Sequence, residues 1–260
     1  MMSMFEDHIR LIGETESTNI LLSAEAESGL AYEGYVIRTE HQTGGRGRLD
    51  RNWESPPGKS ILFSALLYPD IDINKLSIIG LMISIVILDA VSAFLEDNNS
   101  LRNISEDSLS LKWPNDILVR GKKLCGILCQ SGIDAKGDRY VVIGAGLNVN
   151  QDRDNFSSEI ESTATSLKIL TGRSQNREQL FSLIIGKLEL YYKKLKTSGT
   201  GWIISEWIRV SRIIGKNLTV QQQDEQITGI CVGLEPNGAL QLKVSSGKVI
   251  SVYSGDTAID

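Results

Sequence analysis

The alternation of hydrophobic and polar residues divides residues 1–212 into short strands and a few helices. Alternation with period two, or a short apolar run bounded by turn residues, predicts strands over 5–12, 35–38, 60–67, 109–113, 117–119, 124–130 and 140–143. Apolar residues at helical spacing, and acids and hydroxyls ahead of the first such run, predict helices over 20–27, 76–88, 176–195 and 202–212. The polar residues 98–108 are expected to be a loop or the approach to a strand. Hairpins with helices on one face indicate an α+β domain on a mixed or antiparallel sheet.

The pattern changes from about residue 213. Turn residues separate strand-like runs over 217–222, 227–234, 239–244 and 248–253. Short strands at this spacing predict a small β-barrel or meander. We therefore expect two domains, 1–212 and 213–260.

The segment 76–88 must be distinguished from a membrane span, because it is uncharged and rich in Ile, Leu and Met. Asp89 ends the uncharged run, which is shorter than the roughly 20 residues that a span requires. Small residues also give it a narrow polar stripe. We interpret it as the buried core helix of a soluble protein and expect no membrane partner.

The chain is acidic, with a formal net charge of −5 and a pI near 5.3. This balance argues against a general binder of nucleic acid or of membrane surfaces. The three cysteines are an odd number without a Cys-x-x-Cys pair, and the N-terminus has no signal-like basic and apolar segment. Reduced thiols in a cytoplasmic protein fit these features better than a disulfide framework or a zinc site.

Residues 41–53 hold an unusual concentration of glycine and arginine for so acidic a chain. Three glycines and three arginines lie within residues 44–51. Glycine lets the backbone approach a ligand closely, and arginine offers a planar fork to phosphate or carboxylate oxygens. The composition predicts an anion-binding loop, with a solvated, flexible basic loop as the alternative.

Other short motifs do not carry a function. Residues 58–60 resemble the end of a P-loop, but the earlier glycine that this motif requires is Trp53. Residues 144–146 lack the third glycine of a dinucleotide-binding fingerprint. The two histidines are too few for a histidine metal cluster, and no Ser-His-Asp spacing is supported.

Four segments in a fixed order remain. They are Ser17-Thr18-Asn19, then 42–48 (Gln-Thr-Gly-Gly-Arg-Gly-Arg), then 112–116 (Lys-Trp-Pro-Asn-Asp) with 123–128 (Lys-Leu-Cys-Gly-Ile-Leu), then 144–150 (Gly-Ala-Gly-Leu-Asn-Val-Asn). In this order and at these separations they resemble the biotin–protein ligases, from about residue 8 to the C-terminal end. The resemblance implies a catalytic domain of the class II synthetase-like type, followed by a small SH3-like β-barrel.

The resemblance also implies a two-step reaction. Biotin and MgATP would give biotinyl-5′-AMP and pyrophosphate, and the activated biotin would then acylate a lysine of a carrier protein. The default acceptor is the biotin carboxyl carrier domain of acetyl-CoA carboxylase. The residue types fit this chemistry, because joining a carboxylate to an α-phosphate brings anions together and needs cations and Mg²⁺ at the transition state.

The same resemblance implies roles for particular side chains. Those at the ureido group of biotin would be Ser17, Thr18 and Gln42, and those along its tail and carboxylate would be Gly45, Arg46 and Gly126. On the nucleotide side, Trp53 would cover the adenylate, Lys123 would reach the carboxylate and phosphate, and the phosphates would meet Asn148 and Arg177. The predicted ligand-binding set is completed by Asn19, Arg48, Arg51, Lys112 and Asn115. Within it, the catalytic cations would be Lys123, Arg48 and Lys112, and the metal ligands would be Asp116 and Asn148.

Two departures from the family pattern carry expectations of their own. Asp50 stands where the family usually has glycine, and its carboxylate is expected to pair with Arg48 or Arg51. The chain also begins almost directly at the catalytic domain, without the N-terminal DNA-binding domain of many bacterial members, so we expect no repressor function and no DNA partner.

Three alternatives stay open. A lipoate–protein ligase would share the fold and the adenylation chemistry. A non-catalytic module that binds biotin or nucleic acid is a second alternative, which the acidic pI and the many cations suited to ATP argue against. The oligomeric state is the third open point, because a homodimer and a monomer are both compatible with the sequence.

Overall fold

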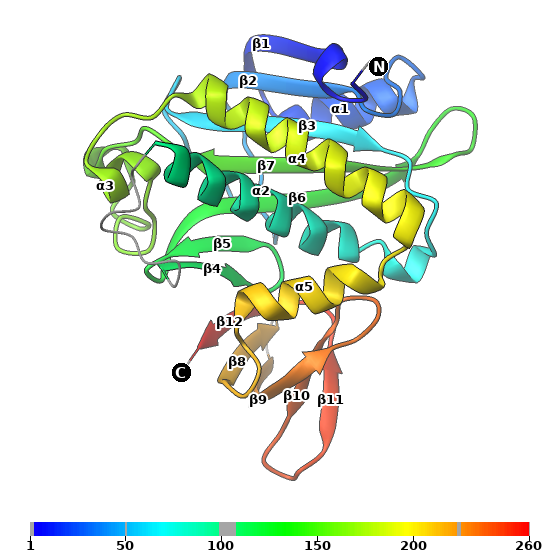
Figure 1. Ribbon diagram of the computed structural model, residues 1–260, viewed down its shortest axis with the longest axis vertical. Helices are drawn as coiled ribbons and strands as arrows, with labels where there is room; N and C mark the ends of the chain where they lie inside the picture. The colour runs from blue at the N-terminus through cyan, green and yellow to red at the C-terminus, as the bar shows by residue number, and fades with distance from the viewer. Residues whose placement is uncertain (1–2, 50, 99–107, 223–224, 260) are drawn as a thin grey trace.

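A computed structural model of the chain describes residues 3–49, 51–98, 108–222 and 225–259. They form a large mixed sheet with helices packed on it, and a smaller antiparallel sheet beside it (Figure 1). Asp50 and residues 99–107 of the predicted polar loop lie outside the described residues.

The larger sheet has seven strands in the order β1-β2-β3-β7-β6-β5-β4. In chain order they are Ile9–Thr15 (β1), Val36–Gln42 (β2), Ser60–Leu67 (β3), Leu109–Lys112 (β4), Asp116–Val119 (β5), Lys122–Ile133 (β6) and Arg139–Asn148 (β7). β1 pairs with β2 in parallel and the other neighbours pair antiparallel, so the sheet is mixed. The first predicted strand starts later than expected, because residues Glu6–His8 form a 3-10 turn (η1).

Three helices pack on one side of the molecule, and in Figure 1 the first two lie in front of the larger sheet while the third lies below it, where the two sheets meet. They are α2 (Ile78–Asp97), α4 (Arg177–Ser198) and α5 (Gly201–Ser211). By length and composition α2 could cross a membrane, but 14 of its 20 residues are buried inside the protein. It is therefore the core helix that the sequence predicted, and it extends well beyond residue 88.

The helix α1 (Thr18–Glu27) departs from the expectation of helices on one face. Leu22 and Ala26 of α1 pack against Leu66 and Val142 in a cluster separate from the main core under α2 and α4. Because both faces of β3 are covered, all eight of its residues are buried, which explains its continuous apolar run. The remaining helical elements of the described ranges are short: η2 (Ile73–Lys75), η5 (Arg153–Asn155) and α3 (Leu167–Thr171).

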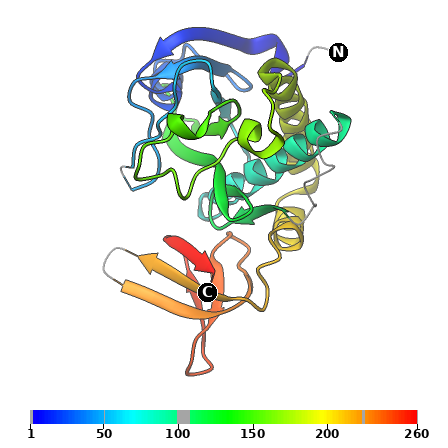
Figure 2. The same cartoon turned by 90° about the vertical axis from the view of Figure 1, so that its left-hand side faces the viewer.

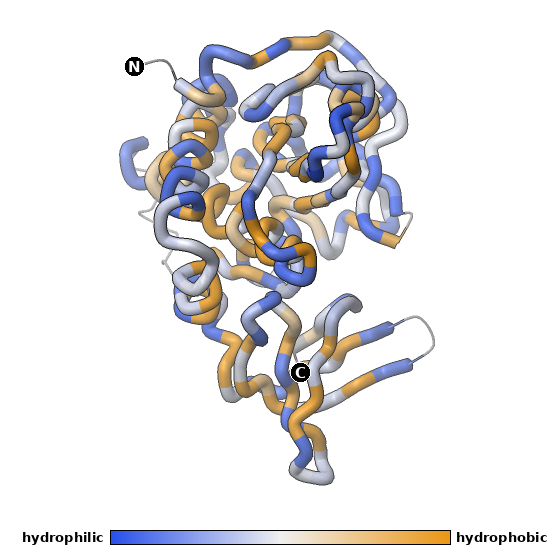
Figure 3. The backbone as a smooth tube through the Cα atoms, turned by 90° about the vertical axis from the view of Figure 1, so that its right-hand side faces the viewer, coloured by the Kyte–Doolittle hydropathy of each residue, from blue (hydrophilic) through white to orange (hydrophobic). Residues whose placement is uncertain are grey.

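The smaller sheet is antiparallel and has the strand order β11-β10-β9-β8-β12. Its strands are Asn217–Gln222 (β8), Glu225–Leu234 (β9), Leu240–Lys243 (β10), Val249–Val252 (β11) and Asp256–Ile259 (β12). Hydrophobic and polar residues alternate along β10 and most of β8, and Figure 3 shows segments of both kinds in this part of the chain. The sequence did not predict β12, and among the described residues no pairing of β11 with β12 closes the sheet into a barrel.

The two sheets meet at the turn after β4. The indole of Trp113 is buried and its Nε1 donates to the carbonyl of Gly238 at 3.0 Å. The carbonyl of Trp113 accepts a hydrogen bond from Thr257 Oγ1 at 2.8 Å. These contacts hold the smaller sheet against the larger one (Figure 2). The boundary that we propose near residue 213 lies in the connection between α5 and β8.

Candidate active site

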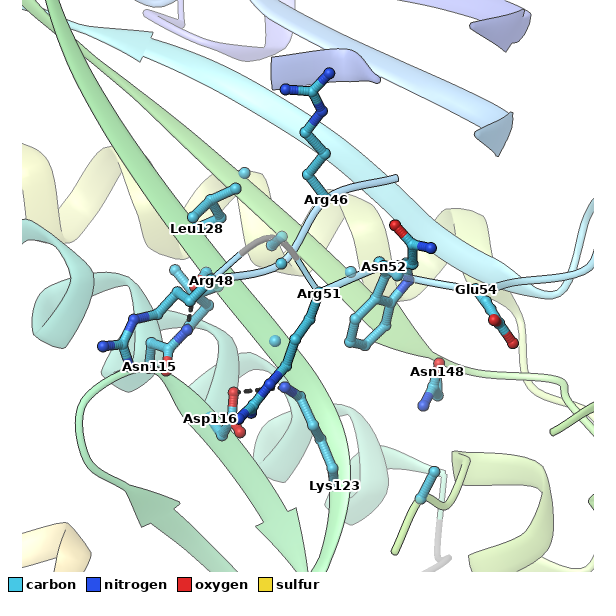
Figure 4. A pocket seen from close by; sticks show the side chains of 18 of the residues that line it. Arg46, Arg48, Arg51, Asn52, Glu54, Asn115, Asp116, Lys123, Leu128 and Asn148 are labelled. Atoms are coloured by element: carbon cyan, nitrogen blue, oxygen red, sulfur yellow. Dashed lines mark hydrogen bonds and ion pairs between the residues drawn. The ribbon is translucent and has the colours of Figure 1, made fainter. Parts of the chain in front are cut away.

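A cavity of about 410 Å³ lies beside the N-terminus of α1 and over strands β6 and β7 (Figure 4). The glycine and arginine loop, the turn after β4, the segment that follows β7 and the first residue of β12 also line it. The predicted ligand-binding residues that it brings together are Ser17, Thr18, Asn19, Gln42, Arg46, Arg48, Arg51, Trp53, Lys112, Asn115, Asp116, Lys123, Gly126 and Asn148. Four segments far apart in the sequence therefore meet at one cavity.

One end of the cavity is a network of uncharged polar groups around Thr18. The Thr18 N–H donates to Gln42 Oε1 at 2.8 Å, and Ser64 Oγ lies 2.7 Å from Thr18 Oγ1 and 2.6 Å from Asn19 Oδ1. Ser64 is the donor toward both acceptors, and Thr18 Oγ1 in turn donates to Gln42 Oε1 at 3.1 Å, because an amide oxygen only accepts. Gln42 has its oxygen engaged and can donate through Nε2. The end thus offers donors and acceptors to a ligand that carries both.

Asn19 holds this network in place from beneath. Its Nδ2 donates to the carbonyl of Leu128 at 3.1 Å and to Gln130 Oε1 at 2.9 Å. Gly144 makes room for it, because a Cβ at that position would lie 2.0 Å from Asn19 Oδ1. Asn19 is 5% exposed. It therefore positions Ser64 and Thr18, and its small exposed area leaves it little direct contact with a ligand.

The indole of Trp53 lies flat over the glycine positions of two adjacent strands. A Cβ on Gly146 of β7 would lie 2.4 Å from Trp53 Cε2, and one on Gly126 of β6 would lie 2.9 Å from Trp53 Cζ3. Lys123 Nζ lies 5.7 Å from the centroid of the same ring. Trp53 Nε1 is buried without a hydrogen-bond partner in the described structure. The glycines are there because a side chain would occupy the space of the ring.

Backbone hydrogen bonds fold the glycine and arginine loop into a tight hairpin. Trp53 N donates to the carbonyl of Gly45 at 2.9 Å, and Gly47 N donates to the carbonyl of Arg51 at 2.6 Å. A Cβ at Gly45 would lie 2.6 Å from the carbonyl oxygen of Trp53. Gly45 is not among the residues that line the cavity. It lets the two sides of the hairpin approach, so its predicted contact with the biotin tail stays a prediction.

Cations gather along the opposite wall, where Figure 4 shows Arg48, Arg51 and Lys123 beside Asp116, while Arg46 points away from this group. Lys123 Nζ lies 2.9 Å from Asp116 Oδ1, and Arg46 lies 3.4 Å from Glu16 Oε1. Lys112, the last residue of β4, lies on the same wall. A wall of this kind attracts an anionic ligand such as a carboxylate or a phosphate.

Arg48 is the most enclosed of the loop arginines. Its Nη1 donates to Asn115 Oδ1 at 3.4 Å and to the carbonyl of Gly255 at 3.2 Å. Burial lowers the pKa of Arg48, and the carboxylates of Asp256 and Asp116 oppose that shift. Asn115 is itself fixed, since its Nδ2 donates to the carbonyl of Ile127 at 2.6 Å. The turn after β4 therefore holds Arg48 at the cavity.

The two predicted metal ligands, Asp116 and Asn148, differ in how far their oxygens are already engaged. Asp116 lines the cavity with a side chain that is 16% exposed, and Lys123 is its ion-pair partner. Asn148 Oδ1 accepts from Gln151 Nε2 at 2.7 Å, and Asn148 Nδ2 donates to the carbonyl of Thr165 at 3.1 Å. No cluster of three or more His, Cys, Asp or Glu side chains occurs within the described residues. One carboxylate fits Mg²⁺ that arrives on substrate phosphates, which is how Mg²⁺ is usually bound.

Arg177 is not brought to the cavity. Its Nη1 donates to the carbonyl of Ser60 at 3.0 Å and its Nη2 pairs with Glu40 Oε2 at 2.7 Å. It begins α4 and ties that helix to β3, which is a structural task. Its predicted contact with the phosphates has no support in this geometry.

Some lining residues were missing from the sequence prediction. Phe156, Ile160 and Ala164, in the segment that follows β7, add apolar side chains to the wall of the cavity. This segment is pinned to β6, because Lys123 N donates to the carbonyl of Thr163 at 2.7 Å. Asp256 of β12 also lines the cavity. No spacing or motif marks these residues, because each reaches the cavity through the tertiary fold.

Comparison with known proteins finds a matching family model for each of the two parts of the chain. The model of the biotin/lipoate A/B protein ligase family matches residues 11–148, and the biotin protein ligase C-terminal domain matches residues 213–258. A bifunctional ligase/repressor BirA of Bacillus spizizenii is 32% identical over 246 residues, which cover 95% of this chain and 71% of that protein. A biotin–[acetyl-CoA-carboxylase] ligase of Mycobacterium tuberculosis is 30% identical, with 95% of this chain and 86% of that protein covered.

Solved structures agree with these sequence matches. The biotin protein ligase from Aquifex aeolicus, in complex with biotin and ATP, superposes with a TM-score of 0.78 and 26% sequence identity. The superposition covers 97% of this chain and 98% of that one. On these matches, the chain belongs to the biotin/lipoate A/B protein ligase family and carries the C-terminal domain of its biotin protein ligases.

Proposed function

We propose that this chain is a biotin–protein ligase that activates biotin with MgATP and transfers it to a lysine of a biotin carboxyl carrier domain. The observation that carries the proposal is the division of one cavity into an uncharged hydrogen-bonding end and a cationic wall. Biotin has the matching division, with a ureido ring at one end and a carboxylate at the other. The relatives and the solved structure described above support the same reaction.

The polar end is suited to the ureido ring. Thr18 Oγ1 gives its proton to Gln42 Oε1, so its oxygen can accept from a ring N–H, while Gln42 Nε2 can donate to the ring carbonyl. Ser17 is buried beside them, and its side chain caps no helix N–H. Each group would find a partner in biotin. The valeryl tail would pass Gly126, beside the Trp53 ring and the Lys123 side chain that lie next to this glycine.

The first chemical step joins two anions. A carboxylate oxygen of biotin attacks the α-phosphorus of ATP, a P–O bond to the leaving pyrophosphate breaks, and biotinyl-5′-AMP remains. Lys123 and Arg46 would hold the carboxylate, and Arg48, Arg51 and Lys112 would stabilise the charge that develops on the phosphates. Mg²⁺ carried by ATP would neutralise the pyrophosphate, with Asp116 as its carboxylate ligand and Asn148 as a weaker candidate because Oδ1 already accepts from Gln151.

The second step transfers the acyl group. The ε-amine of the carrier lysine attacks the carbonyl carbon of the adenylate, the mixed anhydride bond breaks, and AMP leaves. The adenylate must be kept from water until then. Trp53 and the glycine and arginine loop are placed to cover it, and Trp53 is anchored to the loop by its bond to Gly45.

A lipoate–protein ligase is the nearest competing function. The dithiolane ring of lipoate has no N–H or C=O, so Thr18 Oγ1, Gln42 Nε2 and the buried Ser17 hydroxyl would gain no hydrogen bond from it, which favours biotin over lipoate. Exchange of labelled pyrophosphate into ATP separates the alternatives, with biotin, lipoate or no acid added to the purified chain. Biotin-dependent exchange is expected. Exchange that depends on lipoate, or that needs no acid, would contradict the proposal, and no exchange at all would favour a non-catalytic module.

Three further points belong to the proposal. The net charge of −5 supports a ligase that binds no operator DNA, and the three free cysteines support a cytoplasmic location. A mobility-shift assay with biotin and ATP present tests that part, and specific retardation of an operator fragment would contradict it. The proposal allows a homodimer as well as a monomer, and sedimentation of the ligand-free and the biotin-loaded protein decides between these two states.

A further inference from the structure

The smaller sheet reaches into the cavity through Asp256, the first residue of β12. Its carboxylate forms an ion pair with Arg51 and lies 3.9 Å from Arg48 Nη1. The preceding carbonyl, that of Gly255, accepts a hydrogen bond from Arg48 at 3.2 Å. Arg48 and Arg51 of the glycine and arginine loop are thus bound by two consecutive residues, Gly255 and Asp256, near the C-terminal end of the sequence.

The position of Asp256 is fixed by its own strand. It pairs with Gln221 of β8, and its neighbour Thr257 donates to the carbonyl of Trp113 in the other sheet. Gly255 has φ +137°, and a Cβ there would lie 2.5 Å from Val220 Cγ1. Only glycine fits this close approach readily. The backbone therefore delivers both the carbonyl and the carboxylate to the loop from a rigid support.

The arginines need such a partner because cations crowd this wall. Arg46 has Glu16 and Lys123 has Asp116, whereas the ion pairs of Arg48 and Arg51 within the described structure both go to Asp256. Burial is the main cause that lowers the pKa of Arg48, the charges of Asp256 and Asp116 raise it, and the charge of Arg51 lowers it, so Asp256 offsets part of the repulsion between the two arginines. Without it, the repulsion would push the loop away from the cavity until a phosphate arrived.

We propose that Asp256 is a positioning residue for the adenylation reaction: it holds Arg51 and Arg48 at the cavity and so makes the smaller sheet part of the nucleotide site. This inference rests on the proposed ligase function. Asp256 acts through the arginines and does not touch the reacting atoms. Arg48 keeps its hydrogen bonds to Asn115 and to the Gly255 carbonyl when the Asp256 carboxylate is removed, so the main effect is expected on nucleotide binding and on retention of the adenylate, and the chemical step should change little.

The test is Asp256→Asn, compared with the unchanged chain in biotin-dependent exchange of pyrophosphate into ATP. Arg51 is 67% exposed and Asp256 30%, so the pair is screened, and the KM for ATP is expected to rise about two- to fivefold. Release of bound biotinyl-AMP should accelerate by the same factor, with kcat at saturating ATP nearly unchanged. Asp256→Ser removes the same charge with a smaller side chain and should match Asp256→Asn, and Asp256→Glu should recover most of the loss.

The matched control is Asp89→Asn, which removes a carboxylate of similar exposure that pairs with Lys187 at 2.8 Å on α2 and α4. It should leave the KM for ATP unchanged. If the inference holds, Asp256→Asn raises the KM for ATP by a smaller factor in an Arg51→Gln background than in the unchanged chain, because only the contact with Arg48 remains to be lost. An unchanged or lower KM for ATP in both charge-removing variants would overturn the inference, since Asp256 would then be idle or would only compete with the nucleotide. Absence of biotin-dependent exchange in the unchanged chain would instead refute the proposed function.

Discussion

Gly146→Ala is expected to damage the site through a single methyl group. Gly146 lies in β7 with no unusual backbone angle, so alanine fits the strand itself. The new Cβ would lie 2.4 Å from Trp53 Cε2 and 2.7 Å from Trp53 Nε1. Carbon atoms pack at about 3.5–4.0 Å, so the indole would have to move by roughly 1 Å. Trp53 could then no longer lie flat over the strands.

The size of the effect follows from the cost of overpacking. Forcing an extra methyl group into a packed site costs about 1–3 kcal/mol. If the cost falls on the adenylate-bound state, the affinity for the adenylate falls by between about fivefold and about a hundredfold. We therefore expect the KM for ATP and the release rate of biotinyl-AMP to rise by at least about fivefold, together with a lower thermal midpoint.

Gly186→Ala is the control for the same substitution elsewhere. A Cβ at Gly186 in α4 would meet nothing within 4 Å. Alanine favours a helix over glycine by about 0.5–1 kcal/mol, so this variant should be slightly more stable and equally active. The assay is filtration of the enzyme–adenylate complex followed by timed release of labelled AMP. Equal release from Gly146→Ala and the unchanged chain would refute the role of Trp53 as a cover.

Three other predictions test separate parts of the site. Lys123→Gln should reduce adenylate formation about 10²- to 10³-fold, the range for losing one preorganised charge stabiliser, whereas Lys122→Gln, an exposed neighbour, should remain active in the same exchange assay. Biotin or biotinyl-AMP should protect residues 44–51 from trypsin, and equal cleavage with and without ligand would count against loop closure. Burial raises the pKa of Cys125, which is 0% exposed, so the native protein should resist thiol reagents at pH 8 at this position; fast labelling without unfolding would contradict that burial.

The local features of the site could be predicted from the sequence. Glycines at 126, 144 and 146 are placed by direct neighbours, which is why the motifs that contain them were informative. The helix start at Thr18 follows from hydroxyls ahead of an apolar run, and the structure confirms it within two residues. The long apolar run of β3 predicted a buried strand, because a strand covered on both faces has no polar side.

Contacts made through tertiary structure could not be predicted in this way. Asp256 reaches Arg51 only because β12 pairs with β8 and the smaller sheet docks on Trp113. The apolar pattern of α1 gives no information about which face of the sheet it covers, so the expectation of helices on one face was too simple. The role of Arg177 stays a prediction, since within the described structure it pairs with Glu40 and is not among the residues that line the cavity.

The most direct test of the account is to isolate the adenylate in the cavity and then discharge it. The purified chain is incubated with biotin, Mg²⁺ and ATP labelled at the α-phosphate, filtered to remove free nucleotide, and then given a biotin carboxyl carrier domain. The account predicts biotin-dependent retention of label on the enzyme, followed by release of AMP as the carrier lysine becomes biotinylated. Label that is not retained, is retained without biotin, or is retained but not discharged to the carrier would contradict it.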